Sequence, residues 1–327
     1  MSQTMRAWRV TAHGEPEKVL ALHDVDVPTP GPGEVLIRVR TVAVNFPDVL
    51  LARGQYQVRP EPPFTPGVEL CGDVVKLGEG AAGVAVGDRV VGSKIGVLAE
   101  YASVPAAAVH PAPAGLDDAA AASLIIAYQT AWFGLHRRAA IRPGETLLVH
   151  AAAGGVGTAA CQLGAAAGAK VIGVVGSAAK VEVAKAAGAA EVYLRDQDWV
   201  AEIKRTHGSV DVVFDPVGGA AFEGSARCVG FEGRIVVVGF AGGDLPRIRA
   251  DHVLVKNYGV LGLHWGLYQQ RNPELVEEAH AELVRLVDEG VVRPVVGDVV
   301  PFEQAPSAVQ RLADGTTTGR VVVRVAG

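Results

Sequence analysis

The chain has 327 residues and a net charge of −5, with 30 basic against 35 acidic side chains and 49% hydrophobic residues. This length favours two domains, and the slight acidity without a cluster of Lys or Arg argues against nucleic acid or an anionic membrane surface as a partner. The three cysteines, Cys71, Cys161 and Cys228, are isolated in the sequence, which excludes a disulfide framework and a cysteine metal knuckle. We therefore expect a cytoplasmic protein in which Cys71 and Cys161 are small core residues.

No targeting or membrane segment is expected. The N-terminal residues lack the apolar region of a signal peptide. Thr146–Ala169 contains no Asp, Glu, Lys or Arg, but it is rich in glycine and poor in large apolar side chains. That composition differs from a membrane-spanning helix and instead predicts a strand, a glycine loop and a helix.

Residues 1–122 predict a β-rich, irregular domain. Val35–Val42 and Asp88–Gly92 have the pattern of short strands, and turn signals containing Pro and Gly bound them. An Ala-rich segment over Asp117–His136 then predicts one helix, with acidic residues at its N-terminus.

From Thr146 onward the pattern changes to apolar strands that alternate with helices. The predicted strands are 146–150, 170–175, 192–194, 210–214 and 234–239, and the predicted helices are 156–167, 178–187, 199–207 and 273–289. Fully apolar strands with helices between them favour a parallel sheet covered on both faces. A final strand over Arg320–Val325 is expected to return to the first domain. The predicted division is residues 1–122 with 268–327, and residues 123–267.

The strongest chemical signal is the segment Ala151–Gly157, which follows a predicted strand and opens a helix. Aligned with the dinucleotide fingerprint Gly-x-Gly-x-x-Gly, it has Ala152, Gly154 and Gly157 at the three glycine positions. Gly154 would let the backbone approach a pyrophosphate at the helix N-terminus, and Gly157 would permit close packing of helix on strand. A tight turn between packed elements is the alternative, which the repeated strand–helix alternation makes less favourable.

The end of the second strand of this series distinguishes the two dinucleotides. An NAD site places Asp or Glu there to bind the ribose 2′-hydroxyl. Here Gly176, Ser177 and Lys180 follow the strand, with no carboxylate before Glu182. Ser177 can donate a hydrogen bond, and Lys180, with Arg195 as a second cation, suits a 2′-phosphate, unless these cations are ordinary solvated residues. The sequence therefore favours NADPH over NADH.

Several segments, spread over nearly the whole length, carry a family resemblance. They are Val44–Asp48, Arg53–Tyr56, Pro66–Glu69, Gly87–Val90, Pro143–Glu145, His150–Gly157 and Lys256–Tyr258. On these residues the chain resembles the quinone oxidoreductase (ζ-crystallin-like) branch of the medium-chain dehydrogenase/reductase superfamily. The resemblance implies an α/β fold, in which a Rossmann doubly wound parallel sheet binds NADPH in a cleft and a β-rich GroES-like catalytic domain is built from both chain ends.

The resemblance also bears on zinc. Zinc alcohol dehydrogenases carry Cys where this chain has Asn45, and His where it has Val68 beside Glu69. Their lobe with four clustered cysteines is absent too, because Val90–Ser103 contains none. Since catalytic zinc needs three protein ligands from Cys, His and carboxylate, we expect no metal.

The implied site residues come from both domains. The predicted catalytic residues are Asn45, Tyr56 and Tyr128. Asn45 would contact the nicotinamide ribose or the substrate oxygen, and the two tyrosines are either pocket walls that hydrogen-bond a carbonyl or packing aromatics. The predicted cofactor contacts are Asn45, Thr130, Gly154, Gly155, Val156, Gly157, Gly176, Ser177, Lys180, Arg195, Phe240, Ala241, Leu263, His264 and Trp265. His264 has the alternative of an ordinary loop histidine, and His150 is expected to be structural.

The expected function is zinc-free hydride transfer from NADPH to quinones or related conjugated carbonyls, with the cofactor supplying the reactivity. One alternative is reduction of an enoyl thioester or enone C=C bond, because the same segments resemble polyketide enoyl reductase domains. Those domains sit within long multidomain chains, whereas we expect this chain to be complete. Another alternative is an NADPH-binding protein of the crystallin or RNA-binding kind with incidental catalysis. The family also implies a homodimer that joins sheet edges near Val253–Leu263.

Overall fold

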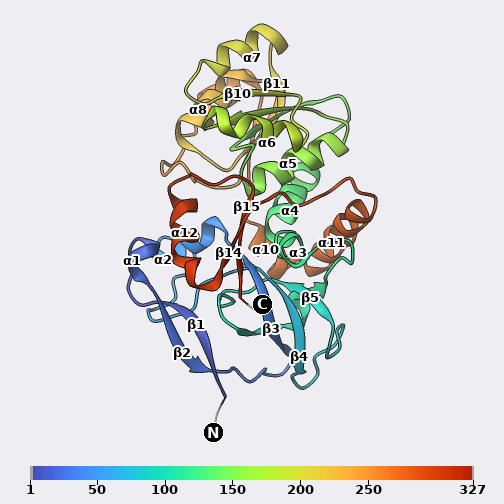
Figure 1. Cartoon of the computed structure of the whole chain (residues 1–327). Helices are drawn as coiled ribbons and strands as arrows, with labels where there is room; N and C mark the ends of the chain where they lie inside the picture. Colours follow the sequence, from blue (N-terminus) through green and yellow to red (C-terminus); the bar gives the residue numbers. More distant parts are fainter. Residues whose placement is uncertain (1–2, 326–327) are drawn as a thin grey trace. The chain divides into compact units, whose positions relative to one another are not determined.

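A computed structural model of the chain describes residues 3–325, which form two units (Figure 1). The first unit runs up to Ile125 and resumes at Val296, and the second is Ile126–Val295. The second boundary therefore lies later than the expected residue 268. The reason is that helix α11 (Pro273–Asp288) belongs with α4 (Ile125–Trp132), where the Trp132 indole Nε1 donates to Glu282 Oε2 at 2.9 Å.

The first unit is β-rich, with a seven-stranded sheet and a separate β1-β2 pair. Six strands of the sheet follow the order β14-β15-β3-β4-β5-β7, and the seventh, β6, pairs with β3. Its elements are β1 (Thr4–Val10), α1 (Pro16–Val19), β2 (Leu20–Asp26), β3 (Glu34–Ala43), α2 (Phe46–Ala52), β4 (Leu70–Leu77), β5 (Arg89–Gly92), β6 (Tyr101–Pro105), η1 (Ala106–Ala108), β7 (Val109–Pro111), α3 (Asp118–Ala122), β14 (Val296–Pro301), η4 (Phe302–Gln304), α12 (Ala305–Ala313) and β15 (Arg320–Arg324). The last strand pairs antiparallel with β3, placing Val323 opposite Val42. This pairing confirms the expected return of the last strand to the first sheet.

Strand β3 lies at the centre of this sheet and connects its parts. It pairs with β15, β4 and β6, and most of its residues are buried. Its apolar, largely β-branched side chains suit a pleated surface that is packed on both faces. Valines of β3 belong to a core shared with β15 and α12.

The second unit is built on a six-stranded parallel sheet in the order β10-β9-β8-β11-β12-β13 (Figure 1). Its elements are α4, the π-helix η2 (Phe133–Arg138), β8 (Thr146–His150), α5 (Gly155–Ala166), β9 (Lys170–Val175), η3 (Ala178–Lys180), α6 (Val181–Ala186), β10 (Glu191–Leu194), α7 (Trp199–His207), β11 (Val210–Asp215), α8 (Gly219–Cys228), β12 (Val229–Val237), α9 (Ala250–Lys256), β13 (Gly259–Gly262), α10 (Trp265–Arg271) and α11. Numbered from β8, the order is 3-2-1-4-5-6, the doubly wound Rossmann arrangement. The predicted fold class is confirmed. The strand order reverses between β8 and β11, where such sheets bind ligands at their carboxyl ends.

Residues 117–138 form separate helices, whereas the sequence predicted one continuous helix. Asp117 caps α3 by accepting from the Ala120 N–H at 2.8 Å, but α3 ends at Ala122 and α4 begins at Ile125. At the break, the Ser123 hydroxyl donates to the Ala119 carbonyl at 2.8 Å. Such local side-chain bonds compete with helical continuation, which explains the interruption.

Among residues 3–325, no helix is long and apolar enough to cross a bilayer.

Strand β13 is the last strand in the order of the parallel sheet, so its outer edge has no partner strand within the described chain. Pairing of this edge in a homodimer stays a prediction.

Candidate functional site

The predicted phosphate-binding turn lies at the reversal point of the parallel sheet. Strand β8 ends at His150, and Gly154 is the N-cap of α5. A Cβ added to Gly157 would lie 2.1 Å from the Ala151 carbonyl oxygen, so only glycine fits where the helix crosses the strand end. A Cβ added to Gly154 would meet only one protein atom within 4 Å, the same oxygen, at 3.3 Å. The backbone around Gly154 is therefore open to a ligand, in front of the unpaired N–H groups of the α5 N-terminus.

The turn departs from the fingerprint at Ala152, and the neighbouring strand accommodates the departure. Ala152 is fully buried, and its methyl group would lie 2.9 Å from a Cβ placed on Gly173 of β9. Because Gly173 has no side chain, β9 leaves room for the methyl group of Ala152. Alanine at the first fingerprint position is therefore compatible with a phosphate-binding turn here.

Two cations follow neighbouring strand ends at this edge of the sheet, Lys180 after β9 and Arg195 after β10. A Cβ on Gly176 would lie 3.1 Å from Arg195 Nη2, which places the guanidinium beside this glycine. Burial lowers the pKa of Lys180, and the charge of Arg195 lowers it further. The segment between Gly176 and Val181 contains no carboxylate that could neutralise these two charges. A bound anion would relieve their repulsion.

Sequence reasoning missed Asp215, which ends β11 on the other side of the reversal point. It is fully buried, and its Oδ1 accepts from the N–H groups of Val217 at 2.8 Å and Gly218 at 3.0 Å. Its Oδ2 is buried without a hydrogen-bond partner in the described part of the chain. A carboxylate at the end of an apolar strand, before a Pro and two glycines, is the signal that could have found it.

His150, at the end of β8, has the structural role expected for it. Its Nε2 lies 2.7 Å from the Ser225 hydroxyl, and its ring packs edge-on against Trp199 with centroids 5.2 Å apart. Burial lowers its pKa, which the charge of Asp215 partly opposes. Cys71 and Cys161 are buried, as expected for core residues, and Cys228 is buried too; burial raises the pKa of each thiol.

The predicted cofactor contacts that follow β12 and β13 differ in their exposure to solvent. Phe240 and Ala241 follow β12 and are exposed, whereas Leu263 and Trp265 after β13 are buried. The Trp265 indole Nε1 donates to Gln129 Oε1 at 3.0 Å. Sequence reasoning missed Gln129, which lies one residue before Thr130 and is buried with it on α4.

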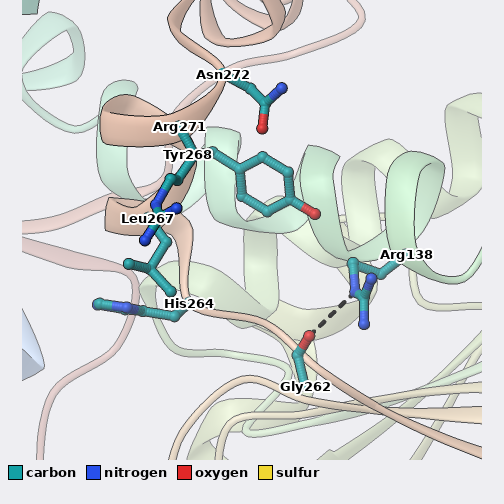
Figure 2. Close-up of a pocket in the computed structure, with 7 residues that line it drawn as sticks. All are labelled: Arg138, Gly262, His264, Leu267, Tyr268, Arg271 and Asn272. Carbon is teal, nitrogen blue, oxygen red and sulfur yellow. Dashed lines mark hydrogen bonds between the residues drawn. The ribbon is translucent and has the colours of Figure 1, made fainter.

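His264 lines an open pocket of about 280 Å³ (Figure 2). The pocket residues are Arg138, Gly262, His264, Leu267, Tyr268, Arg271 and Asn272. Arg138 Nε donates to the Gly262 carbonyl oxygen at 3.0 Å, the dashed line in Figure 2. The lining contains two arginines and no acidic residue, so this is a cationic surface, but Leu263 and Trp265 are not part of it.

Tyr128 fits the packing alternative better than the pocket-wall one. Its side chain is buried, and its single O–H has two acceptors within reach, Gln162 Oε1 at 3.1 Å and the Arg293 carbonyl oxygen at 3.2 Å. A buried phenol needs such partners. A catalytic role for Tyr128 stays a prediction that these contacts do not favour.

In the first unit, Asn45 lies at the start of α2 in a buried polar cluster. Its Nδ2 donates to the Ala43 carbonyl at 2.9 Å and to Glu69 Oε2 at 3.0 Å. Its Oδ1 accepts from Arg320 Nη1 at 2.8 Å, and Arg320 Nη2 lies 2.5 Å from the same Glu69 oxygen. The Pro66–Glu69 motif could have pointed to Glu69, but no local signal marks Arg320, 251 residues further along the chain.

Asp48, also missed as a site residue, connects this cluster with Tyr56. Its two oxygens accept from the backbone N–H groups of Asn45 at 2.8 Å and Gly67 at 3.0 Å. Burial raises the pKa of Asp48 to about 7, although these bonds and the charge of Arg320 act to lower it. Burial also raises the pKa of the half-buried Tyr56, and the charge of Asp48 adds to the rise. Tyr56 is therefore electrostatically coupled to the cluster, and its contact with substrate stays a prediction.

The chemistry of this cluster differs from that of a catalytic zinc site. Asn45 uses its amide hydrogens within the cluster, and the buried side chain at position 68 is valine, which offers no lone pair. Within residues 3–325, no three His, Cys, Asp or Glu side chains are grouped so as to hold a metal ion.

Comparison with known proteins agrees with this architecture. A family model described as alcohol dehydrogenase GroES-like domain matches residues 31–114, and one described as zinc-binding dehydrogenase matches residues 155–281. The chain is 36% identical over 300 residues to a quinone oxidoreductase-like protein 2 homolog of Nematostella vectensis, covering 90% of this chain and 82% of that protein. It is 32% identical over 325 residues to the quinone oxidoreductase of Sus scrofa, covering 98% and 97%. The crystal structure of Escherichia coli quinone oxidoreductase complexed with NADPH superposes with a TM-score of 0.91 at 31% identity, covering 98% of this chain and 100% of that one.

Proposed function

Because the chain belongs to the zinc-independent quinone oxidoreductase branch of the medium-chain dehydrogenase/reductase superfamily, we propose that it transfers hydride from NADPH to quinones or related conjugated carbonyls. The observation that carries the cofactor assignment is the guanidinium of Arg195 beside Gly176, with Lys180 following in the same segment and no carboxylate where an NAD site would hold one. The Escherichia coli relative, solved with NADPH, supports the same assignment.

The residues of the second unit fit this cofactor. The open backbone at Gly154 and the N-terminus of α5 would hold the pyrophosphate, and Lys180 and Arg195 would hold the 2′-phosphate. When bound, NADPH supplies the hydride, and the protein supplies orientation and a dry site. No metal is part of the proposal, so the electrophile has to be activated by its own conjugation.

The proposed activity is tested by following NADPH oxidation with 1,4-benzoquinone, 9,10-phenanthrenequinone and crotonyl-CoA, each with and without a chelator. We expect turnover of the quinones at a rate that the chelator leaves unchanged. Turnover confined to crotonyl-CoA would instead assign the protein to enoyl-thioester reduction. NADPH binding with no turnover of any electrophile would leave a cofactor-binding protein whose catalysis is incidental.

The cofactor preference is tested with Lys180→Ala. Loss of one charge-assisted hydrogen bond of about 1.5–3 kcal/mol should raise the Kd for NADPH roughly 10- to 100-fold and leave the Kd for NADH nearly unchanged. Arg195→Ala should act in the same direction. Titration of nucleotide fluorescence measures both constants.

A matched control for this change is Lys185→Ala in α6, the helix whose N-cap is Lys180. Lys185 forms an exposed ion pair with Glu182 at 3.0 Å, so its removal should change neither Kd. Equal weakening of NADPH and NADH by Lys180→Ala would show that Lys180 is not at the 2′-phosphate.

A further inference from the structure

The open pocket of about 280 Å³ in Figure 2 is separate from the residues proposed to hold the phosphates of NADPH. All of its lining residues belong to the second unit, and His264 is the one predicted cofactor contact among them. His264 is exposed, whereas Leu263 and Trp265 on either side of it are buried, so the pocket faces solvent. The proposed function therefore assigns no role to the two arginines of this pocket.

The π-helix η2 holds two of the pocket's side chains in place. Its last residue, Arg138, donates from Nε to the Gly262 carbonyl oxygen at 3.0 Å, which leaves both Nη groups without a partner in the described chain. Its first residue, Phe133, packs on the ring of Tyr268 with centroids 4.2 Å apart. π-Helices are rare and frequently occur at functional sites. The pocket is thus built by three elements, η2, the end of β13, and α10.

The polar groups of the pocket are mainly hydrogen-bond donors. The side chain of Arg271 has no hydrogen bond or ion pair within residues 3–325, and the lining contains no carboxylate. Figure 2 shows the hydroxyl group of Tyr268 pointing toward the side of the pocket on which Arg138 lies. Two guanidinium groups without a counter-ion provide two positive charges and planar sets of N–H donors, which match the oxygens of a phosphate group. A phosphate monoester carries a charge of about −1.5 to −2 at pH 7, which balances them.

We infer that this pocket binds a phosphate monoester dianion or the inorganic phosphate ion through Arg138 and Arg271. Its volume lies below the roughly 300–1,000 Å³ of sites that enclose a whole small molecule, so it suits a phosphate group. Because the pocket is open, a larger molecule that carries the group can extend into solvent. The two sources to be distinguished are inorganic phosphate and the 3′-phosphate of CoA, which a CoA thioester would bring.

Calorimetric titration with inorganic phosphate, CoA and dephospho-CoA tests the inference, since dephospho-CoA lacks only the 3′-phosphate. Saturating NADP⁺ is present, so that Lys180 and Arg195 are occupied. We expect the wild type to bind inorganic phosphate, and Arg138→Gln and Arg271→Gln each to weaken this binding about 10-fold, the effect of losing a charge-assisted hydrogen bond. If CoA also binds about 10-fold more tightly than dephospho-CoA, the group belongs to a larger ligand. If the two bind equally, the ligand is the free ion.

Arg137→Gln is the matched control, because it removes the same charge from the residue before Arg138, which is exposed and does not line the pocket. It should leave the affinity for phosphate unchanged. Equal weakening by all three variants would show that net charge attracts the anion, and would overturn the inference. A wild type that binds neither phosphate nor CoA would overturn it too, as would binding that Arg138→Gln and Arg271→Gln leave intact.

The result is independent of the proposed function. The Kd for NADPH and the turnover of quinones should be the same in Arg138→Gln, Arg271→Gln and the wild type. A wild type that bound no NADP⁺ would count against the proposed function, but the comparison of wild type with Arg271→Gln would still report on the pocket.

Discussion

Gly157→Ala is expected to abolish most of the activity and to destabilise the fold. The added methyl would lie 2.1 Å from the Ala151 carbonyl oxygen, and ordinary van der Waals contact begins at 3.4 Å. The atoms that collide belong to the backbone, so no flexible side chain can move aside. Overpacking of this kind costs about 3 kcal/mol, and displacing the N-terminus of α5 by about 1 Å should lower kcat/KM for NADPH roughly 100-fold. Urea unfolding and steady-state kinetics measure the two effects.

The neighbouring variant Gly154→Ala is the matched control, because it adds the same methyl group to the same turn without the close contact. The nearest protein atom would be 3.3 Å away, and the backbone of Gly154, at φ −88° and ψ 177°, suits alanine. We expect a stability change below about 1 kcal/mol together with a strong loss of NADPH affinity. If both variants lost stability equally, the contact with the Ala151 carbonyl would not explain the loss. If Gly154→Ala bound NADPH normally, the turn would not hold the pyrophosphate.

These two glycines also show why this part of the site is predictable from sequence. A turn between a strand and a helix depends on neighbouring residues, so its signal is a short pattern with fixed spacing. The cation pair is less local, because Arg195 reaches Gly176 from the end of the adjacent strand β10. The sequence still predicts that both cations lie at this edge, since each follows a strand and the carboxyl ends of parallel strands share one edge of the sheet.

The Asn45 cluster lies beyond such reasoning. Glu69 and Arg320 are 251 residues apart, and only the pairing of β15 with β3 brings Arg320 to the start of α2. The sequence predicts that the last strand returns to the first sheet, but not which of its residues is buried beside a carboxylate. Helix α8 was missed for a different reason: it begins at Gly219, after Gly218, and both have positive φ, which is typical of a turn.

Removing the positive charge of Arg320 is expected to lower the stability of the first unit more than any other single change. Arg320→Met would leave the fully buried carboxylate of Glu69 without its cation. Breaking a buried ion pair in this way costs about 3–5 kcal/mol, because one charge stays desolvated and uncompensated. Urea unfolding should show this loss, and the double variant Arg320→Met/Glu69→Gln should recover part of it, since a neutral amide is less costly to bury than a carboxylate.

An exposed ion pair provides the comparison that separates burial from charge pairing as such. Arg205 and Glu202 lie 2.7 Å apart on α7, with side-chain exposures of 72% and 49%. Water screens this pair, so Arg205→Met should cost far less than Arg320→Met. If the two variants lost similar stability, or if the double variant were no more stable than Arg320→Met alone, the desolvated charge of Glu69 would not be the cause.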